Sequence, residues 1–110
     1  MITVKKKKIE FQSTPFDVDS LKILEKLGVN TYKIASCDIT NFLLLEKIAK
    51  TKKPIFLSTG AANINEIKDA VKLISKYNKK IVIMHCILCY PTKMQDANLK
   101  SITLLKKKFP

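Results

Sequence analysis

The sequence predicts an α/β fold with a parallel sheet, because two features of its pattern agree. Four short apolar runs alternate with segments of helical periodicity, at 9–13, 31–36, 55–58 and 81–86. The runs end in a regular series, at Ser13, Ser36, Thr59 and Cys86, of which the first three are 23 residues apart. A hydrophobic content of 46% over 110 residues is enough for one packed domain. We therefore expect four parallel βα units.

The segments between the runs contain signals for helix ends. Asp17 is a suitable N-cap for a helix whose apolar stripe stops at Gly28, a suitable C-cap. Asp38 or Thr40 is expected to cap a second helix, which must end before Pro54. The sequence therefore places a helix after each of the first two strands.

Two further helices are expected in the second half of the chain. Asn63 and Glu66 are spaced as a capping box, and Leu99, Ile102 and Leu105 form an apolar stripe. The run at 81–86 is almost entirely apolar, which is typical of a strand covered on both faces. Short connections between parallel strands are right-handed crossovers, so two architectures remain: an open doubly wound sheet, or an arc of a (β/α)₈ barrel.

Lys33 is unusual because it lies in the middle of the apolar run at 31–36. An ammonium group in a buried strand is costly unless an anion meets it, so Lys33 either pairs with a carboxylate or receives an anionic ligand. Hydroxyl residues end the neighbouring runs at 13–14 and 58–59. Parallel strands would bring these ends to one edge of the sheet, which favours a ligand.

The formal net charge of +12 raises the question of nucleic-acid binding. All 21 basic residues are lysines, and the sequence contains no arginine, the usual reader of guanine edges and phosphates. Most lysines stand in runs beside strands or helix ends, where a solvated charge is ordinary. A nucleic-acid partner is therefore disfavoured but kept as an alternative.

Cys37, Cys86 and Cys89 are odd in number and follow no signal peptide, which predicts reduced thiols in a cytoplasmic protein. No apolar run approaches the roughly 20 residues that cross a bilayer. Cys86 and Cys89 could serve in redox chemistry or zinc binding, but no second cysteine pair completes a zinc site. His85 and Cys86 could form a base and nucleophile, although neighbours on a strand point to opposite faces.

Four motifs occur at the ends of the predicted strands. In chain order they are Ser13-Thr14-Pro15-Phe16-Asp17; Tyr32-Lys33-Ile34-Ala35-Ser36 with Asp38-Ile39-Thr40-Asn41; Lys53-Pro54-Ile55-Phe56-Leu57-Ser58-Thr59-Gly60; and His85-Cys86 with Tyr90-Pro91. Together they resemble the sialic acid synthase family, which includes N-acetylneuraminate, legionaminate and pseudaminate synthases and spore-coat polysaccharide relatives. The resemblance implies that residues 1–110 are one partial TIM-barrel domain, a half barrel that corresponds to the third to sixth strands.

The resemblance also implies an activity. Members of the family condense phosphoenolpyruvate with an amino-sugar aldehyde such as N-acetylmannosamine, giving a 2-keto-3-deoxy sugar acid and phosphate. A divalent metal, manganese or magnesium, activates the aldehyde. By resemblance, Thr14, Lys33, Ser36 and Ser58 would bind phosphoenolpyruvate, and Tyr90 would lie near the sugar. Lys33 is then expected to point away from the helices, on the same side as the three hydroxyl residues.

The chain also departs from the family pattern. Leu88 stands where relatives place a serine or asparagine, and the family's metal-binding histidines and catalytic glutamate belong to strands that this chain lacks. No catalytic residue or metal ligand is therefore assigned here. The resemblance predicts a truncated or split synthase that is inactive alone and that self-associates or pairs with a complementary fragment. The alternative is a half barrel that binds phosphoenolpyruvate without catalysis.

Simpler structural roles remain open for the same residues. Lys33 could be paired with a carboxylate in the barrel interior. Ser36 and Ser58 could be turn residues whose hydroxyls bond to nearby backbone. Asp38 and Asn41 are better suited to capping a helix than to binding a ligand.

Overall fold

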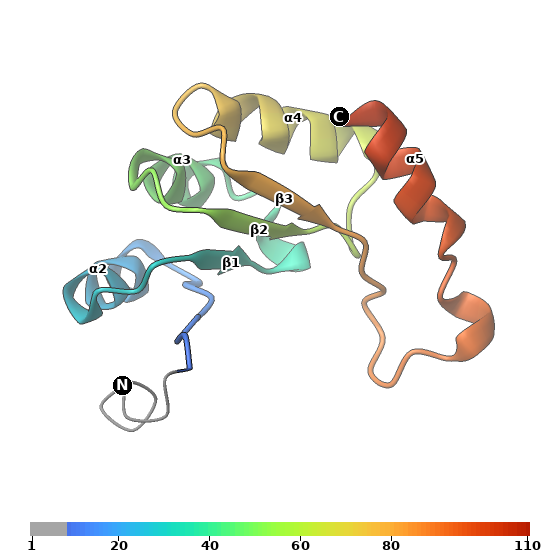
Figure 1. Ribbon diagram of the computed structural model, residues 1–110, viewed down its shortest axis with the longest axis horizontal. Helices are drawn as coiled ribbons and strands as arrows, with labels where there is room; N and C mark the ends of the chain where they lie inside the picture. Colours follow the sequence, from blue (N-terminus) through green and yellow to red (C-terminus); the bar gives the residue numbers. More distant parts are fainter. Residues whose placement is uncertain (1–8) are drawn as a thin grey trace.

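A three-stranded parallel sheet lies at the centre of the structure, a computed structural model that describes residues 9–110 (Figure 1). The strands lie in chain order: β1 (Tyr32–Ile34), β2 (Ile55–Ser58) and β3 (Ile81–Met84). The predicted α/β class with a parallel sheet is confirmed. The basic lead-in over Met1 to Lys8 lies outside the described residues.

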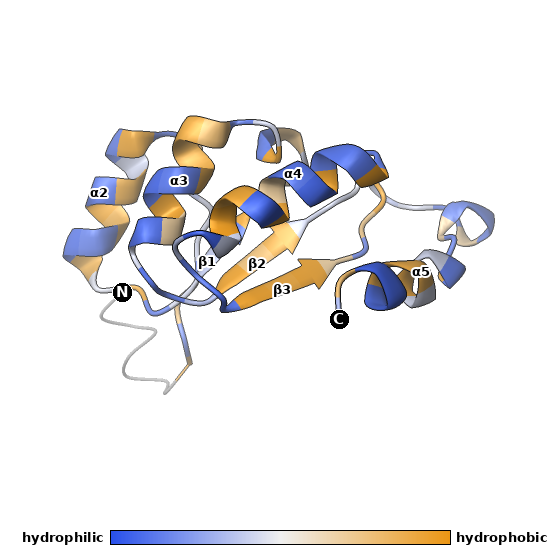
Figure 2. Cartoon of the chain, turned by 90° about the horizontal axis from the view of Figure 1, so that it is seen from above, coloured by the Kyte–Doolittle hydropathy of each residue, from blue (hydrophilic) through white to orange (hydrophobic). Residues whose placement is uncertain are grey.

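Three helices form a layer on one face of this sheet, as Figure 2 shows from above. Residues 9–110 contain the α-helices α2 (Val18–Leu27), α3 (Phe42–Lys50), α4 (Ile64–Ser75) and α5 (Lys100–Lys108), and the short 3-10 helices η1 (Ser36–Asp38) and η2 (Met94–Asp96). The layer consists of α2, α3 and α4, whereas α5 lies beyond the end of β3 (Figure 1). None of the helices within residues 9–110 is long and apolar enough to cross a membrane.

The helices begin and end largely where the sequence predicts. Asp17 caps α2, and Gly28 ends it in the left-handed conformation with φ of 70°. The cap of α3 is Asn41, so the expectation of Asp38 or Thr40 is wrong. The reason is that η1 first takes up the residues after β1, which moves the helix start further along the chain.

The hydrophobic core lies between the sheet and this layer of helices. Alternate residues of the strands point into it: Tyr32, Ile34, Ile55 and Leu57 are all 0% exposed. α3 contributes a buried stripe, Leu44, Leu45, Ile48 and Ala49. The capping box at the start of α4 is also present, as predicted from Asn63 and Glu66.

The opposite face of the sheet is not covered by these helices. Lys33, Phe56 and Val82 lie side by side across it in the strand register. Val82 is 47% exposed, so the expectation that its strand is covered on both faces is wrong. Within the described chain, β3 pairs only with β2, and its apolar side chains are therefore less buried than those of the central strand.

The prediction of a full strand at 9–13 is also wrong. It is reduced to a single parallel bridge between Ser13 and Tyr32, with the Lys33 amide donating to the Ser13 carbonyl at 3.4 Å. Pro15 follows closely and cannot donate a backbone hydrogen bond, which limits further pairing. The sheet therefore has three strands and a bridge in place of four strands.

The last predicted helix is present as α5, but its apolar stripe is mostly uncovered. Leu105 is 9% exposed, whereas Leu99 is 68% and Ile102 is 51% exposed. α5 packs at the margin of the core, so only one side chain of the stripe reaches it.

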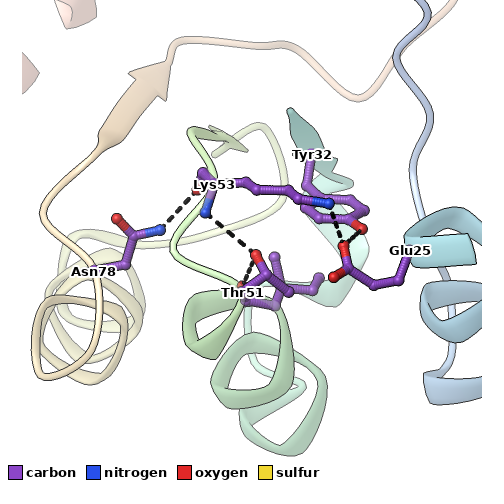
Figure 3. Close-up of polar contacts among 6 residues, drawn as sticks. Glu25, Tyr32, Thr51, Lys53 and Asn78 are labelled. Atoms are coloured by element: carbon purple, nitrogen blue, oxygen red, sulfur yellow. Dashed lines mark hydrogen bonds and ion pairs between the residues drawn. The ribbon is translucent and has the colours of Figure 1, made fainter. Parts of the chain in front are cut away.

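A polar network joins the elements at the amino end of the sheet (Figure 3). The Tyr32 hydroxyl and the Lys53 ammonium both donate to one carboxylate oxygen of Glu25, the latter at 2.6 Å. The Asn78 amide donates to the Lys53 carbonyl at 2.7 Å, and the Thr51 hydroxyl accepts from the Lys53 amide at 3.3 Å. This network connects α2 and β1 to the turns that precede β2 and β3.

Glu25 is held in its ionised form by this network. Partial burial works against ionisation, but the hydrogen bonds from Lys53 and Tyr32 outweigh it and lower the pKa of Glu25 below its usual 4.5. A carboxyl whose pKa falls on folding stabilises the fold at pH values above its unfolded-state pKa. That contribution is lost as the pH falls through the lower folded-state pKa.

Replacing Glu25 with glutamine is expected to lower the free energy of unfolding at pH 7 by about 1 kcal/mol, because solvent partly screens the ion pair whereas the hydrogen-bonded Tyr32 is buried. The difference between E25Q and the wild type should shrink as the pH falls below 4.5. Urea unfolding at a series of pH values measures both effects. D69N, on the exposed side of α4, is the matched control, and an equal loss in it would contradict the role of the network.

Candidate anion-binding site

The carboxyl ends of the three strands meet at one edge of the sheet, opposite the polar network. Ser36 begins η1 directly after β1, and Ser58 is the last residue of β2. His85 and Cys86 follow β3 at the same edge. The predicted strand-end residues are therefore brought to one side of the molecule.

Ser36 has a structural partner at this edge. Its hydroxyl, in a residue that is 8% exposed, accepts a hydrogen bond from the Gly60 amide at 3.0 Å. The turn at Gly60 approaches the chain after β3 so closely that a Cβ atom would lie 2.8 Å from the Cys86 carbonyl oxygen. Ser36 thus holds together the ends of β1 and β2, and only glycine fits beside Cys86.

Ser58 differs from Ser36 because its hydroxyl is buried and unpaired. The residue is 1% exposed, and its Oγ has no hydrogen-bond partner among the described residues. The neighbouring Thr59 hydroxyl, by contrast, donates to the Met84 carbonyl at 2.9 Å. A buried unpaired hydroxyl costs about 1–3 kcal/mol, so the Ser58 hydroxyl is a candidate for binding a ligand.

Lys33 lies on the uncovered face of the sheet and is half-buried. Its burial is less complete than the sequence pattern implies, because no helix of the layer covers this face. The three ion pairs found within residues 9–110 do not include Lys33. The carboxylate pairing considered for Lys33 is therefore not observed in the described chain.

Thr14 is positioned by the bridge of its neighbour Ser13 to Tyr32, which brings it alongside β1. Tyr90 is not brought into the site: it lies in the loop after β3 and is 87% exposed. The structure therefore places Thr14, Lys33, Ser36 and Ser58 on β1, β2 and the adjoining segments, and leaves Tyr90 outside.

His85 and Cys86 have separate partners, which removes the nucleophile and base hypothesis. The His85 Nε2 lies 2.8 Å from the Ala97 carbonyl oxygen, and the Cys86 thiol donates to the Met84 carbonyl at 3.7 Å. Both residues follow β3 and do not belong to it. The sequence predicts their separation because neighbouring residues of a strand point to opposite faces. That reason is wrong, since β3 ends at Met84.

The described residues do not fit a divalent metal site. Nowhere between residues 9 and 110 do three histidine, cysteine or acidic side chains come together as ligands. Divalent cations such as manganese and magnesium require several oxygen or nitrogen ligands from one cluster. No step of chemistry is therefore assigned to a metal held by this chain.

A small hollow on the uncovered face was not predicted from the sequence. It has a volume of about 160 Å³ and is lined by Glu10, Gln12, Thr31 and Phe56. Thr31 and Phe56 alternate with core residues along their strands, which is the signal that could have placed them on this face. Glu10 and Gln12 could not be placed, because their segment forms only one bridge to the sheet.

The fold and this edge define the chain as a parallel α/β domain with a lysine within β1 and hydroxyl side chains at the carboxyl ends of its strands. The model of the NeuB family matches residues 2–110, so the chain belongs to the NeuB family. The predicted resemblance to the sialic acid synthases is confirmed.

Individual proteins agree with the family match. The chain is 43% identical to an N,N'-diacetyllegionaminic acid synthase from Campylobacter jejuni, over 99% of its own length and 34% of that protein. It is 48% identical to an uncharacterized protein from Methanocaldococcus jannaschii, over 92% of its length and 30% of that protein. The crystal structure of a sialic acid synthetase from Leptospira borgpetersenii superposes with a TM-score of 0.92, at 44% identity over 96% of this chain and 37% of that one. The chain thus spans about a third of the relatives it matches.

The two serines are expected to respond differently to removal of their hydroxyl groups. S36A should lower the free energy of unfolding by about 1 kcal/mol, because it leaves the partly buried Gly60 amide without its acceptor. S58A should leave stability unchanged or raise it, since it removes an unpaired polar group. Urea unfolding of the two variants measures the contrast. Equal losses would mean that Ser58 has a structural partner.

Proposed function

We propose that this chain supplies the phosphoenolpyruvate-binding part of a sugar-acid synthase, as a half barrel of the NeuB type. Its family membership and the names of its relatives support this proposal. The reaction is the condensation of phosphoenolpyruvate with an amino-sugar aldehyde. The site consists of Lys33, Ser58, Thr14 and Ser36, with Tyr90 near the sugar.

One observation carries the proposal: a lysine without a carboxylate partner and a buried hydroxyl without a hydrogen-bond partner belong to adjacent strands. Lys33 is in β1 and Ser58 ends β2, within a described chain whose ion pairs are formed by other lysines. Buried polar side chains normally have hydrogen-bond partners. Two side chains without them at neighbouring strands indicate a ligand that is anionic and accepts hydrogen bonds.

Phosphoenolpyruvate has the matching chemistry, because it carries a phosphate and a carboxylate. The Lys33 ammonium would neutralise one of these groups, and the Thr14 and Ser58 hydroxyls would donate hydrogen bonds to their oxygens. Ser36 would act indirectly by holding the Gly60 turn, whose amide it already binds. The exposed Tyr90 would meet the sugar only after its loop folds toward the edge.

These residues would bind and orient phosphoenolpyruvate and stabilise negative charge as it shifts during condensation. The divalent metal that the family resemblance implies would activate the aldehyde. Within residues 9–110 no ligand cluster for such a metal is found. We therefore assign to this chain the binding of phosphoenolpyruvate, with turnover requiring metal ligands beyond those found among the described residues.

The same observation favours a second candidate, a half barrel that binds phosphoenolpyruvate without catalysis. The two candidates share one site and differ in whether a companion chain or a longer form completes it. The nucleic-acid alternative predicts a different behaviour, an affinity for RNA that falls steeply with salt.

Replacing Lys33 with methionine is expected to weaken phosphoenolpyruvate binding at least about tenfold, because it removes the only cation assigned to the site. The stability should change little, since Lys33 makes no ion pair in the described chain. Isothermal titration with phosphoenolpyruvate measures the affinity. K68M removes the same charge from the exposed side of α4 and should bind as the wild type does.

The controls separate this proposal from the alternatives. S58A should also weaken binding while leaving the fold intact. If RNA binds with an affinity that collapses with salt and phosphoenolpyruvate does not bind, the nucleic-acid alternative replaces the proposal.

The isolated chain is expected to show no synthase turnover with manganese, phosphoenolpyruvate and N-acetylmannosamine. It is also expected to associate with itself or with a complementary fragment, because among residues 9–110 β3 pairs on one side only, and Val82 and Ile102 are exposed. Product analysis and sedimentation test the two expectations. A monomer with measurable turnover would show that the chain completes the site by itself.

A further inference from the structure

Two lysine-rich segments, 50–54 and 76–80, lie at the amino ends of β2 and β3 (Figure 1). Neither segment contains an aspartate or a glutamate. Together they carry six lysines, Lys50, Lys52, Lys53, Lys76, Lys79 and Lys80, which we call the lysine band. The band is at the opposite end of the strands from Ser36 and Ser58, so it is separate from the candidate anion-binding site.

Hydrogen bonds hold the two segments side by side. The side-chain amide of Asn78, which is buried, donates to the Lys53 carbonyl at 2.7 Å. The same side chain accepts from the Lys80 amide at 2.9 Å, and the Lys80 carbonyl accepts from the Ile55 amide at 2.9 Å. The backbones that carry the lysines are therefore fixed next to each other, which gives the band a defined shape.

Two lysines of the band neutralise the carboxylates that reach it. Lys50 pairs with Glu46 at 2.5 Å, and Lys53 pairs with Glu25 at 2.6 Å. The third ion pair found within residues 9–110 belongs to Lys22, on α2. The remaining four lysines of the band are therefore not balanced by carboxylates of the described chain.

The ends of helices α3 and α4 are the ordinary partners to consider for these four lysines. A helix carboxyl end is equivalent to about half a negative charge, and both helices end at the band. The Lys52 ammonium already meets this need, since it donates to the Tyr77 carbonyl just after α4. Lys76, Lys79 and Lys80 are exposed and exceed the charge of the two helix ends, so the surface remains positive.

We propose that the lysine band docks an acidic segment of another protein, an extended run of aspartate and glutamate residues. Such a segment carries its carboxylates along its length, so the lysines need to be neighbours and do not need to meet at one point. Its backbone amides would also donate to carbonyl groups at the ends of α3 and α4, which lack partners within their helices. A phosphodiester group only accepts hydrogen bonds and would be repelled by these carbonyls.

The side chains of the band disfavour the other polyanions. Nucleic acids are bound through arginine and exposed aromatic rings, but the band has no arginine. Its one aromatic residue, Tyr77, is half-buried, with the Lys50 ammonium 4.9 Å from the ring centre and the hydroxyl donating to Glu46 at 3.1 Å. The band also has no large aliphatic side chain that would insert into a lipid surface.

The test compares two variants of the 110-residue protein that lose the same charge. K76Q/K79Q/K80Q removes the three exposed lysines of the band, and K93Q/K100Q/K107Q removes three exposed lysines elsewhere. The probe is an acetylated peptide of ten glutamates, titrated by calorimetry at low salt. The band variant should bind it at least about tenfold more weakly than the wild type, and the control variant at most about twofold more weakly.

Ten-nucleotide single-stranded RNA and phosphatidylserine vesicles are titrated in parallel, and each is expected to bind the two variants equally. A loss of RNA or vesicle binding confined to the band variant would overturn the choice of an acidic protein segment. Equal losses of peptide binding in the two variants would overturn the band as a site, as would a wild type that does not bind the peptide. Circular dichroism and urea unfolding establish that both variants are folded, as expected for exposed side chains.

Discussion

The alternation of side chains along the parallel strands is the constraint on which the rest of the structure depends. Tyr32 and Ile34 are both 0% exposed beneath the helices, and this burial leaves Lys33 no direction except toward the uncovered face. A shift of one residue in the register would bury the ammonium group in the core and expose two large apolar side chains. The position of the candidate binding lysine is therefore a consequence of core packing. It does not require a special local conformation.

The two ends of the sheet have different hydrogen-bonding properties. At the amino end, Glu25, Lys53 and Asn78 satisfy one another and tie separate elements together (Figure 3). At the carboxyl end, the Ser58 hydroxyl is buried without a partner in the described chain. In a parallel sheet, contacts that stabilise the fold and residues that bind a ligand can therefore lie at opposite ends of the strands, because the loops at the carboxyl ends converge on one edge. The unpaired hydroxyl is a cost that a ligand could offset.

The margin of the sheet explains the behaviour of β3 and α5. Within the part of the chain that the structure describes, β2 has a neighbouring strand on each side and its inward residues are fully buried, whereas β3 has one neighbouring strand and remains partly exposed. α5 contributes only Leu105 to the core and leaves an open cavity beside β3. The chain spans about a third of its relatives. Apolar surface at this margin is available to a ligand, a second copy of the chain or a companion segment.

The sequence by itself determined the alternation of strands and helices, the caps at Asp17, Gly28 and Asn63, and the family, because periodicity, capping chemistry and motif order are local properties of the chain. It also placed Lys33 on the face opposite Ile34, since strand alternation is equally local. Only the tertiary structure decided that the segment at 9–13 forms one bridge, and that the Ser36 hydroxyl bonds to the Gly60 amide while the Ser58 hydroxyl has no partner among residues 9–110. These outcomes depend on which residues from distant segments approach each other. The sequence around a serine does not indicate whether a hydrogen-bond partner from another segment will lie next to its hydroxyl group.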